Sequence, residues 1–340
     1  MSIYILGIES SCDDTSAAVL RDDLLLSNVI ANQEIHYKFG GVVPELASRA
    51  HQQSIIPVVD QAIWQAKLTP QQIQLVAFTQ GPGLLGSLLV GVSFAKAFAL
   101  ALGIPMTGCD HMQAHILSHF IRKPGCKHRV PSFPSLCLTV SGGHTQIVQV
   151  DDSDKMKIMG RTIDDAAGET FDKAAKIMGL PYPGGPVIDR HARKGNPMAF
   201  SFAKPLIAGL DFSFSGLKTS FLYFLRDRLK ENPSFISEYL DDLCASIQKS
   251  IVDILMEKLK KAVEITGITE VAIAGGVSAN SGLREALIRA GQEGAWNVYI
   301  PEFAFTTDNA AMIAISGYLK YLKGDYSMQD AIPYARSRMQ

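Results

Sequence analysis

The chain has 340 residues, which is enough for two lobes of ordinary size that each bury a core. Basic and acidic residues nearly balance, and the formal net charge is -1 at pH 7. This balance excludes a global field that would draw the protein onto nucleic acid or an anionic membrane. Any contact with nucleic acid must therefore be local or shared with a partner.

The cysteines and the N-terminus bear on the compartment. An odd number of cysteines, spread along the chain without a Cys-x-x-Cys pair, fits neither a disulfide framework nor a cysteine-ligated zinc site. We therefore expect a reducing, cytoplasmic compartment. The first residues hold no basic region before their apolar run, so we expect no secretory signal. The five cysteines are Cys12, Cys109, Cys126, Cys137 and Cys244.

The first predicted elements alternate between strands and helices. Residues 3–20 have the pattern of a strand, a short polar turn and a second strand. A helix is predicted over residues 44–66 and a strand over residues 75–79. The long apolar tract 84–102 contains Lys96, and a central lysine is expensive in lipid. We therefore expect this tract to be a buried core helix, not a membrane span.

The second half of the chain opens with a similar unit. Residues 135–150 again have the pattern of a strand, a glycine turn and a strand, which predicts a duplicated core. A helix is expected over 164–178, a Gly/Pro-rich region over 181–216, and two helices across 217–264. Residues 271–280 predict a buried strand that runs into a glycine turn. This alternation favours an α/β protein with largely covered sheets.

We predict two lobes joined by a short connector. The N-terminal lobe spans residues 1–121 and the C-terminal lobe spans 135–324, with 325–340 packing back on the N-terminal lobe. Residues 122–134 form the basic connector between them, which could meet a nucleic-acid backbone, although such charges are usually only solvated. The basic residues of the connector are Arg122, Lys123, Lys127, His128 and Arg129.

Two histidines give the most specific local pattern. His111 and His115 stand four residues apart, so both imidazoles lie on one face of a helix and can bind one metal ion. The alternative is a pair of histidines without a metal, since the pattern is loose. Met112 stands where a zinc protease needs glutamate, which argues against a protease. Asp308 precedes an apolar helix over 309–322, either as its N-cap or as a third metal ligand.

Glycine turns after strands provide candidate phosphate sites. Residues 141–143 and 275–276 can direct backbone N–H groups toward an anion, although such a turn is more often only a tight connection. Residues 81–87 lack the lysine of a P-loop, so a P-loop NTPase is excluded. No G-x-G-x-x-G follows the first strand, which argues against a Rossmann fold.

Motifs in fixed order along the chain resemble one family, the TsaD transferases that make threonylcarbamoyladenosine in tRNA. They extend from the first strand to nearly the last helix, which makes accidental similarity very unlikely. The resemblance implies the two-lobed α/β fold of actin, sugar kinases and heat-shock ATPases (ASKHA), with a duplicated core. The matching segments are 7–15, 40–45, 80–85, 110–115, 140–146, 165–173, 182–186, 212–218, 274–280 and 307–309.

The resemblance also implies the site residues. One divalent metal, iron by preference or zinc, would be held by His111, His115 and Asp308. Asp13 and Asp14, in the first turn, are our candidates to assist proton removal. The implied adenylate-binding residues are Thr139, Val140, Ser141, Gly142, Gly143, Asp172, Gly185, Asp189 and Asn280.

Two positions depart from the family pattern. Gln113-Ala114 stands between the histidines where family members often have Glu-Gly, so no carboxylate is available there. Thr139 stands where archaeal and eukaryotic relatives have a tyrosine that can touch the metal. We expect water or substrate to occupy that position.

The implied activity transfers threonylcarbamoyl from threonylcarbamoyl-AMP to the exocyclic amine of the adenosine next to the anticodon, in tRNAs that read codons beginning with A, and releases AMP. The implied partners are tRNA, a TsaB-like paralogue and a TsaE-like ATPase, with no membrane. One alternative is a sugar or acyl kinase of the same superfold, which would need neither His111 nor His115. Another is a nucleotide-binding scaffold without turnover.

Overall fold

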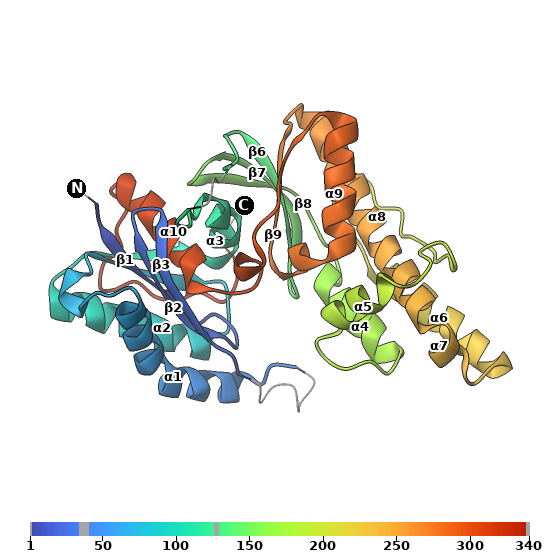
Figure 1. The fold of residues 1–340 in the computed structure, drawn as a ribbon, viewed down its shortest axis with the longest axis horizontal. Coiled ribbons are helices and arrows are strands. Elements are labelled where there is room, and N and C mark those ends of the chain that lie inside the picture. The colour runs from blue at the N-terminus through green and yellow to red at the C-terminus, as the bar shows by residue number, and fades with distance from the viewer. Residues whose placement is uncertain (1, 34–40, 126–128, 338–340) are drawn as a thin grey trace. The chain divides into compact units, whose positions relative to one another are not determined.

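The computed structural model describes residues 2–33, 41–125 and 129–337 (Figure 1). The chain divides into two compact units, each an α/β unit built on a five-stranded mixed sheet. The first unit comprises Met1–Val130, Asp152–Met156 and Pro301–Gln340, and the second comprises Pro131–Asp151 and Lys157–Ile300. The expected α/β fold with two units is confirmed.

In the first unit the strand order is β3-β2-β1-β4-β5. Its strands are β1 (Tyr4–Glu9), β2 (Thr15–Arg21), β3 (Leu24–Ala31), β4 (Leu75–Gly81) and β5 (Met106–Asp110). Its helices are α1 (Pro44–Gln65), α2 (Leu85–Leu102), α3 (His111–Leu117) and α10 (Ala310–Leu322). The predicted helix over 44–66 and the predicted strand over 75–79 correspond to α1 and β4.

In the second unit the order is β10-β9-β6-β7-β8. Its strands are β6 (Ser135–Val140), β7 (Thr145–Asp152), β8 (Lys155–Arg161), β9 (Glu270–Ala274) and β10 (Asn297–Tyr299). Its helices are α4 (Ala167–Ile177), α5 (Gly184–Ala192), α6 (Ser215–Glu231), α7 (Phe235–Glu238), α8 (Leu240–Thr266) and α9 (Ser281–Gly294).

The two sheets have the same topology. In the first, β1 pairs antiparallel with β2 and parallel with β4. In the second, β6 pairs antiparallel with β7 and parallel with β9. The order β8-β7-β6-β9-β10 therefore repeats β3-β2-β1-β4-β5, and the duplicated core predicted from residues 3–20 and 135–150 extends over five strands.

Both faces of the first sheet are covered by helices. Alternate residues of β1 point to opposite faces, as the two-residue period of a strand requires. Ile5 packs in the cluster that includes α10, whereas Leu6 and Ile8 pack in the cluster that includes α1 and α2. A sheet covered on both faces explains why its strands consist of nearly continuous apolar runs.

Helix α10 lies in the first unit, which changes one predicted boundary. The sequence placed residues 301–324 in the C-terminal lobe because they follow its last predicted strand. In the structure, residues 310–315 are buried against β1, β2 and β4 of the first sheet. Packing between segments that are distant in the sequence places α10 in the first unit, and the position of α10 along the chain does not indicate this packing. Residues 325–337 also belong to the first unit.

Helix α2 is the one helix among the described residues that is long and apolar enough, by length and composition, to cross a membrane. Leu88, Val92, Ala95 and Ala99 lie on its buried face, and the last three pack in the cluster shared with α1 and the first sheet. Leu89, on its other face, is exposed. This packing is that of the core helix expected from the tract 84–102.

A helix that the sequence did not predict occupies part of the Gly/Pro-rich region. Helix α5 begins at Gly184, directly after Pro183, and its first turn holds two glycines. No adjacent serine or threonine caps it. The Asp172 carboxylate of α4 instead accepts a hydrogen bond from the Gly184 N–H at 2.7 Å. The capping residue is twelve positions away, so the usual sequence signal of a helix start is missing.

A glycine controls how closely α10 approaches the sheet. A Cβ atom added at Gly317 would lie 2.3 Å from the Cβ of Ala77 on β4. We therefore expect Gly317→Ala to destabilise the protein by about 1–3 kcal/mol, as overpacking does, although alanine usually stabilises a helix. At Gly216, in α6, the nearest atom would lie 3.7 Å away, so Gly216→Ala is the matched control. Urea unfolding of the two variants checks this, and equal midpoints would contradict it.

Candidate functional site

Helix α3 follows β5 without a loop and carries both histidines of the motif. Asp110, the last residue of β5, caps the helix. One oxygen of its carboxylate, Oδ1, accepts hydrogen bonds from the N–H groups of Met112 at 2.9 Å and Gln113 at 3.1 Å. The cap fixes the first turn of α3, which places His111 at the helix start and His115 one turn later.

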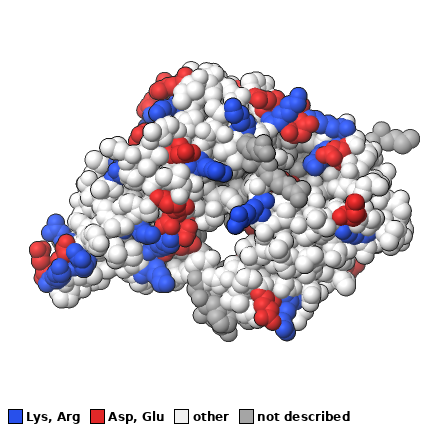
Figure 2. Space-filling view, turned by 180° about the vertical axis from the view of Figure 1, so that it is seen from behind, with Lys and Arg blue, Asp and Glu red and all other residues white. Residues whose placement is uncertain are grey.

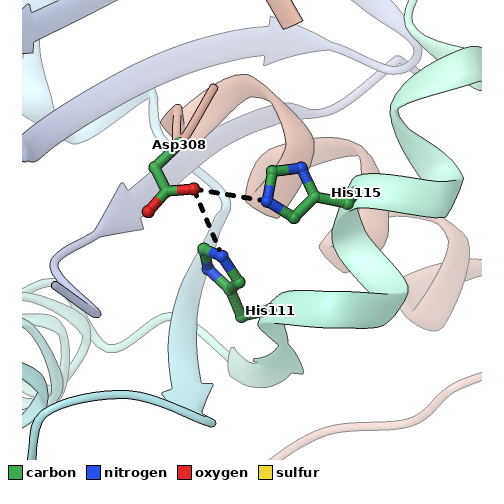
Figure 3. A group of neighbouring side chains, drawn as sticks. All are labelled: His111, His115 and Asp308. Atoms are coloured by element: carbon green, nitrogen blue, oxygen red, sulfur yellow. Dashed lines mark ion pairs between the residues drawn. The ribbon is translucent and has the colours of Figure 1, made fainter. Parts of the chain in front are cut away.

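Asp308 faces both imidazoles from a distant segment of the chain (Figure 3). The Nε2 atoms of His111 and His115 each lie 3.3 Å from its Oδ1 atom. Ligand atoms of the three residues lie within 4.8 Å of one another. The structure therefore brings the three predicted ligands together, and their side chains can hold a metal ion.

The structure also resolves the alternative role of Asp308. The N-cap of α10 is Asn309, whose side chain accepts a hydrogen bond from the Met312 N–H at 3.1 Å. Asp308 is therefore not needed to cap the helix. Asn309 is fully buried, and its cap fixes the residue immediately before α10. The carboxylate of Asp308 is left to face the histidines.

Glu9 orients the ring of His111. The Nδ1 atom of His111 lies 3.0 Å from Oε2 of Glu9, a fully buried carboxylate at the end of β1. Because an ionised carboxylate only accepts, Nδ1 carries the hydrogen and donates it, so Nε2 is the ring nitrogen that faces Asp308 and is placed to bind a metal ion. Carboxylate–histidine pairs of this kind surround protein metal sites.

The charge state of the site also fits a cation. Burial alone would raise the pKa values of Glu9 and Asp308, but His111 outweighs it and lowers both. Burial would likewise lower the pKa of His111, but the carboxylates of Asp308 and Glu9 raise it well above its usual value. The buried carboxylates thus require a positive charge. Two imidazoles and a carboxylate with open positions are a donor set that suits zinc or ferrous iron.

The first turn carries the two acidic residues that the sequence singled out. Burial, together with the negative charges of Asp13, Asp308 and Glu9, raises the pKa of Asp14 to about 7. A carboxyl group with such a pKa can accept a proton at neutral pH. The turn is held by its backbone, because the Cys12 carbonyl accepts hydrogen bonds from His51 Nε2 at 3.0 Å and from Ser87 Oγ at 3.1 Å.

The predicted phosphate turns lie side by side in the second unit. Strands β6 and β9 pair in parallel and end together, so residues 141–143 and Gly275 leave the same edge of the sheet. Gly275 has φ +86, and a Cβ atom there would lie 2.4 Å from the Val140 carbonyl oxygen. Thr139 and Val140 are fully buried within β6, which is paired on both sides, so neither residue is exposed to a ligand in this structure.

Two of these loop residues remain open. A Cβ atom added at Gly142 or Gly143 would meet no atom within 4 Å, so space surrounds both. Ser141 anchors the turn, because its Oγ accepts a hydrogen bond from the His144 N–H at 3.1 Å. Its carbonyl accepts another from Gly168 N–H at 3.2 Å, which brings the turn against the start of α4.

The remaining predicted nucleotide residues tie helices together. Asp172 caps α5 through Gly184, beside Gly185 in the first turn of that helix. Asp189 accepts hydrogen bonds from the N–H and hydroxyl of Ser281 at 3.0 and 2.6 Å. Asn280 caps α9, and its amide donates to Gln248 at 2.7 Å. All four lie in the second unit, and the side chains of Asp172, Asp189 and Asn280 make internal contacts that the sequence did not predict.

The described part of the basic connector makes local ion pairs. Arg122 lies 2.8 Å from Asp23, and Lys123 pairs with Glu302 and lies over the ring of Phe305. All these residues belong to the first unit. Lys127 and His128, which also contributed to the predicted basic tract, lie outside the described residues. The visible basic side chains of the connector are therefore solvated or paired surface groups.

Comparison with known proteins gives the family. The sequence matches "TsaD: tRNA N6-adenosine threonylcarbamoyltransferase" over residues 24–315. A protein of that name from Porphyromonas gingivalis is 60% identical, with 98% of each chain covered. Another from Phocaeicola vulgatus is 59% identical, with 99% of each covered. One from Salinibacter ruber is 49% identical, with 96% of each covered.

Solved structures resemble the fold at low sequence identity. HypF from T. kodakarensis has a TM-score of 0.59 and 13% identity, covering 97% of this chain and 49% of that one. The activator of the 2-hydroxyisocaproyl-CoA dehydratase from Clostridium difficile has a TM-score of 0.50 and 14% identity, covering 96% and 99%. These likenesses concern the fold alone, and the relatives do not favour the kinase alternative. The chain belongs to the TsaD family of tRNA N6-adenosine threonylcarbamoyltransferases.

Proposed function

We propose that this chain transfers the threonylcarbamoyl group from threonylcarbamoyl-AMP to the exocyclic amine of the adenosine next to the anticodon, in tRNAs that read codons beginning with A. The amine nitrogen forms a bond to the carbamoyl carbon, the bond from that carbon to the phosphate oxygen breaks, and AMP leaves. The observation that most supports the proposal is the convergence of His111, His115 and Asp308 on one point. A kinase of the same fold would not need these three residues.

We propose that these three residues hold one divalent metal, iron by preference or zinc. When bound, such a cation would polarise oxygens of the substrate and stabilise charge at the reacting carbonyl. Glu9 keeps the Nε2 atom of His111 available, and the Asn309 cap leaves Asp308 free. An aromatic amine is a poor nucleophile, so charge stabilisation matters more here than a strong base.

The donor nucleotide is assigned to the second unit. The backbone N–H groups of Gly142 and Gly143 bind the phosphate, since the open space beside both glycines allows a ligand to approach the backbone. Ser141 holds the turn, because its own N–H donates to the His144 carbonyl at 2.8 Å. Asp172 and Asn280 shape the adenosine site mainly by fixing the starts of α5 and α9. Gly185 and Asp189 lie on α5, and Thr139 and Val140 are buried in β6, the strand that leads into the phosphate turn.

The proton released by the attacking amine goes to a carboxylate of the first turn. Asp14 is the stronger candidate of the pair with Asp13, because its raised pKa matches a base that works near neutral pH. No residue between the two histidines supplies a base, since Met112 and Gln113 stand there.

Partners are part of the proposal. Figure 2 shows one face on which Lys and Arg side chains lie in small groups mixed with Asp and Glu. With a net charge of -1, such a surface supports shared binding of tRNA by this chain, a TsaB-like paralogue and a TsaE-like ATPase. We place the assembly in the cytoplasm, because the four described cysteines are free thiols.

The direct test measures transfer of labelled threonylcarbamoyl from its adenylate to tRNA, with and without the two partners. We expect label in the tRNA and stoichiometric AMP when all components are present. Label that appears with ATP in a small molecule, and none in tRNA, would overturn the proposal in favour of a kinase.

Glu9 provides an independent test of the metal centre. Glu9→Gln removes the charge beside His111 and is expected to weaken metal binding roughly 10–100-fold, as loss of groups that orient metal ligands does. Chelator competition on the purified full chain measures this affinity. Glu45→Gln, at an exposed position of α1 in the same unit, is the matched control. Unchanged affinity in Glu9→Gln would remove Glu9 from the site.

A further inference from the structure

The C-terminal segment, residues 325–337, borders the strand that leads into the metal helix. Strand β5 is at the edge of the first sheet and ends at Asp110. The Ser327 N–H donates to the Met106 carbonyl at 2.8 Å, and the Ser327 hydroxyl accepts from the Gly108 N–H at 2.8 Å. The segment therefore satisfies backbone groups on the open edge of β5.

The same segment then binds the end of β4 and the loop that follows it. The Gln80 side chain donates to the Ile332 carbonyl at 2.9 Å, and the Tyr334 N–H donates to the Gln80 carbonyl at 3.0 Å. The Gly83 N–H donates to the Ala335 carbonyl at 3.3 Å. Hydrogen bonds on both sides of Tyr334 thus fix its backbone.

This placement brings the Tyr334 hydroxyl to the cap of α3. The hydroxyl lies 3.0 Å from Oδ2 of Asp110 and donates to it. The other oxygen of the same carboxylate, Oδ1, accepts from the N–H groups of Met112 and Gln113. Asp110 is only 8% exposed, so the protein supplies most of the partners of this carboxylate. Both oxygens are engaged, which fixes the orientation of the carboxylate.

We propose that Tyr334 is a positioning residue for the metal centre, acting through Asp110. Its hydroxyl holds the carboxylate in the orientation that caps α3, and the cap sets the first turn, where His111 begins the helix. A small displacement of His111 would weaken the metal site, because the residues that His111 must meet there are held by other elements. Asp308 is held next to the Asn309 cap of α10, and Glu9 accepts a hydrogen bond from Thr79 of β4. The inference rests on the proposed metal site.

The competing explanation is that Tyr334 only anchors the end of the chain. In that case Tyr334→Phe would lower the unfolding midpoint or free the tail but would not change the metal site. Under our proposal Tyr334→Phe lowers metal affinity roughly three- to tenfold, less than the about 10–100-fold typical of groups that touch a ligand directly. Tyr326→Phe, on the same segment and 45% exposed, is the matched control and should leave the affinity unchanged.

The experiment titrates the full-length chain and its variants with Co²⁺ in competition with a chelator. In parallel, amide hydrogen exchange of the first turn of α3 is followed in the metal-free protein. We expect Tyr334→Phe to weaken Co²⁺ binding and to speed exchange at Met112 and Gln113. In an Asp110→Ala background, Tyr334→Phe should have no further effect on either quantity, because its only route to the site has been removed.

The outcomes separate this inference from the proposed function. If the wild-type chain binds Co²⁺ and Tyr334→Phe matches it in affinity and in exchange, the positioning role is overturned and the metal site stands. An equal loss in the Asp110→Ala background would also overturn it, since Tyr334 would then act by another route. If the wild-type chain binds no divalent cation, the metal site itself fails, and the role of Tyr334 toward it fails too.

Discussion

Alanine at His111 or His115 is expected to abolish threonylcarbamoyl transfer and to release the metal. Each variant removes one of three ligands, so the loss of affinity should exceed the roughly 10–100-fold that follows loss of a group behind a ligand. The Nε2 atoms of both imidazoles lie 3.3 Å from Oδ1 of Asp308, and each ring reaches that point from its own position on α3. The remaining histidine therefore cannot take the place of the one removed. The measurements are transfer of labelled threonylcarbamoyl to tRNA and metal content after dialysis.

Gln113→Ala is the matched control for these variants. Gln113 lies on the same short helix, between the two histidines, but it is not one of the three residues whose ligand atoms converge. We expect it to keep the metal and most of the activity, which would also show that no group between the histidines acts as a base. Full activity in a chain without both histidines would contradict the metal-dependent transferase and would reopen the kinase alternative.

Asp14→Asn is expected to lower the transfer activity while it raises the stability of the protein. If Asp14 accepts the proton of the attacking amine, the variant should lose about 10²–10⁴-fold in transfer rate, the usual contribution of a general base. The same change removes a charge that the folded protein disfavours, because burial and the charges of Asp13, Asp308 and Glu9 raise the pKa of Asp14 to about 7. Activity and stability should therefore move in opposite directions.

The raised pKa of Asp14 also fixes how the effect of Asp14→Asn on stability changes with pH. The pKa of Asp14 is about 7 in the folded protein, whereas its ordinary value, expected in the unfolded chain, is 3.8. In the metal-free wild type the resulting destabilisation is absent below the unfolded value, grows as pH rises, and is complete above pH 7. Asp14→Asn should thus be more stable than wild type by roughly 1–3 kcal/mol at alkaline pH, with the difference vanishing near pH 4.

Denaturant unfolding at several pH values, on chelator-treated protein, measures this difference. Asp330→Asn makes the same change at an exposed position of the first unit and should show no such trend. A transfer rate equal to that of wild type in Asp14→Asn would exclude Asp14 as the base. It would leave Asp13, or water, for that role.

Local patterns in the sequence predicted the parts of the site that depend on local geometry. The spacing of His111 and His115 predicts one helical face, and the structure has that face on α3. The alternating runs in residues 3–20 and 135–150 predicted the duplicated hairpins, because a strand repeats every two residues regardless of its surroundings. Family motifs supplied Asp308, which no local pattern distinguishes from a helix cap.

Features that depend on distant contacts were not predicted. No pattern in the sequence assigned a role to Glu9, and its role emerges because β1 ends beside the start of α3. Asp172 caps a helix twelve residues away, so α5 had no local start signal. Helix α10 was assigned to the wrong lobe, because its partners are strands more than two hundred residues earlier in the chain.

The division of the chain has a consequence for synthesis on the ribosome. The first unit is built from both ends of the chain, with nearly all of the second unit inserted between them. His111 and His115 leave the ribosome long before Asp308 does, and Tyr334 follows last of the four. A nascent chain that has completed the second unit therefore still lacks Asp308, and the central β1–α10 packing must wait until α10 has been synthesised. If His111, His115 and Asp308 bind a cation as proposed, the complete set of ligands forms only after the second unit has been made.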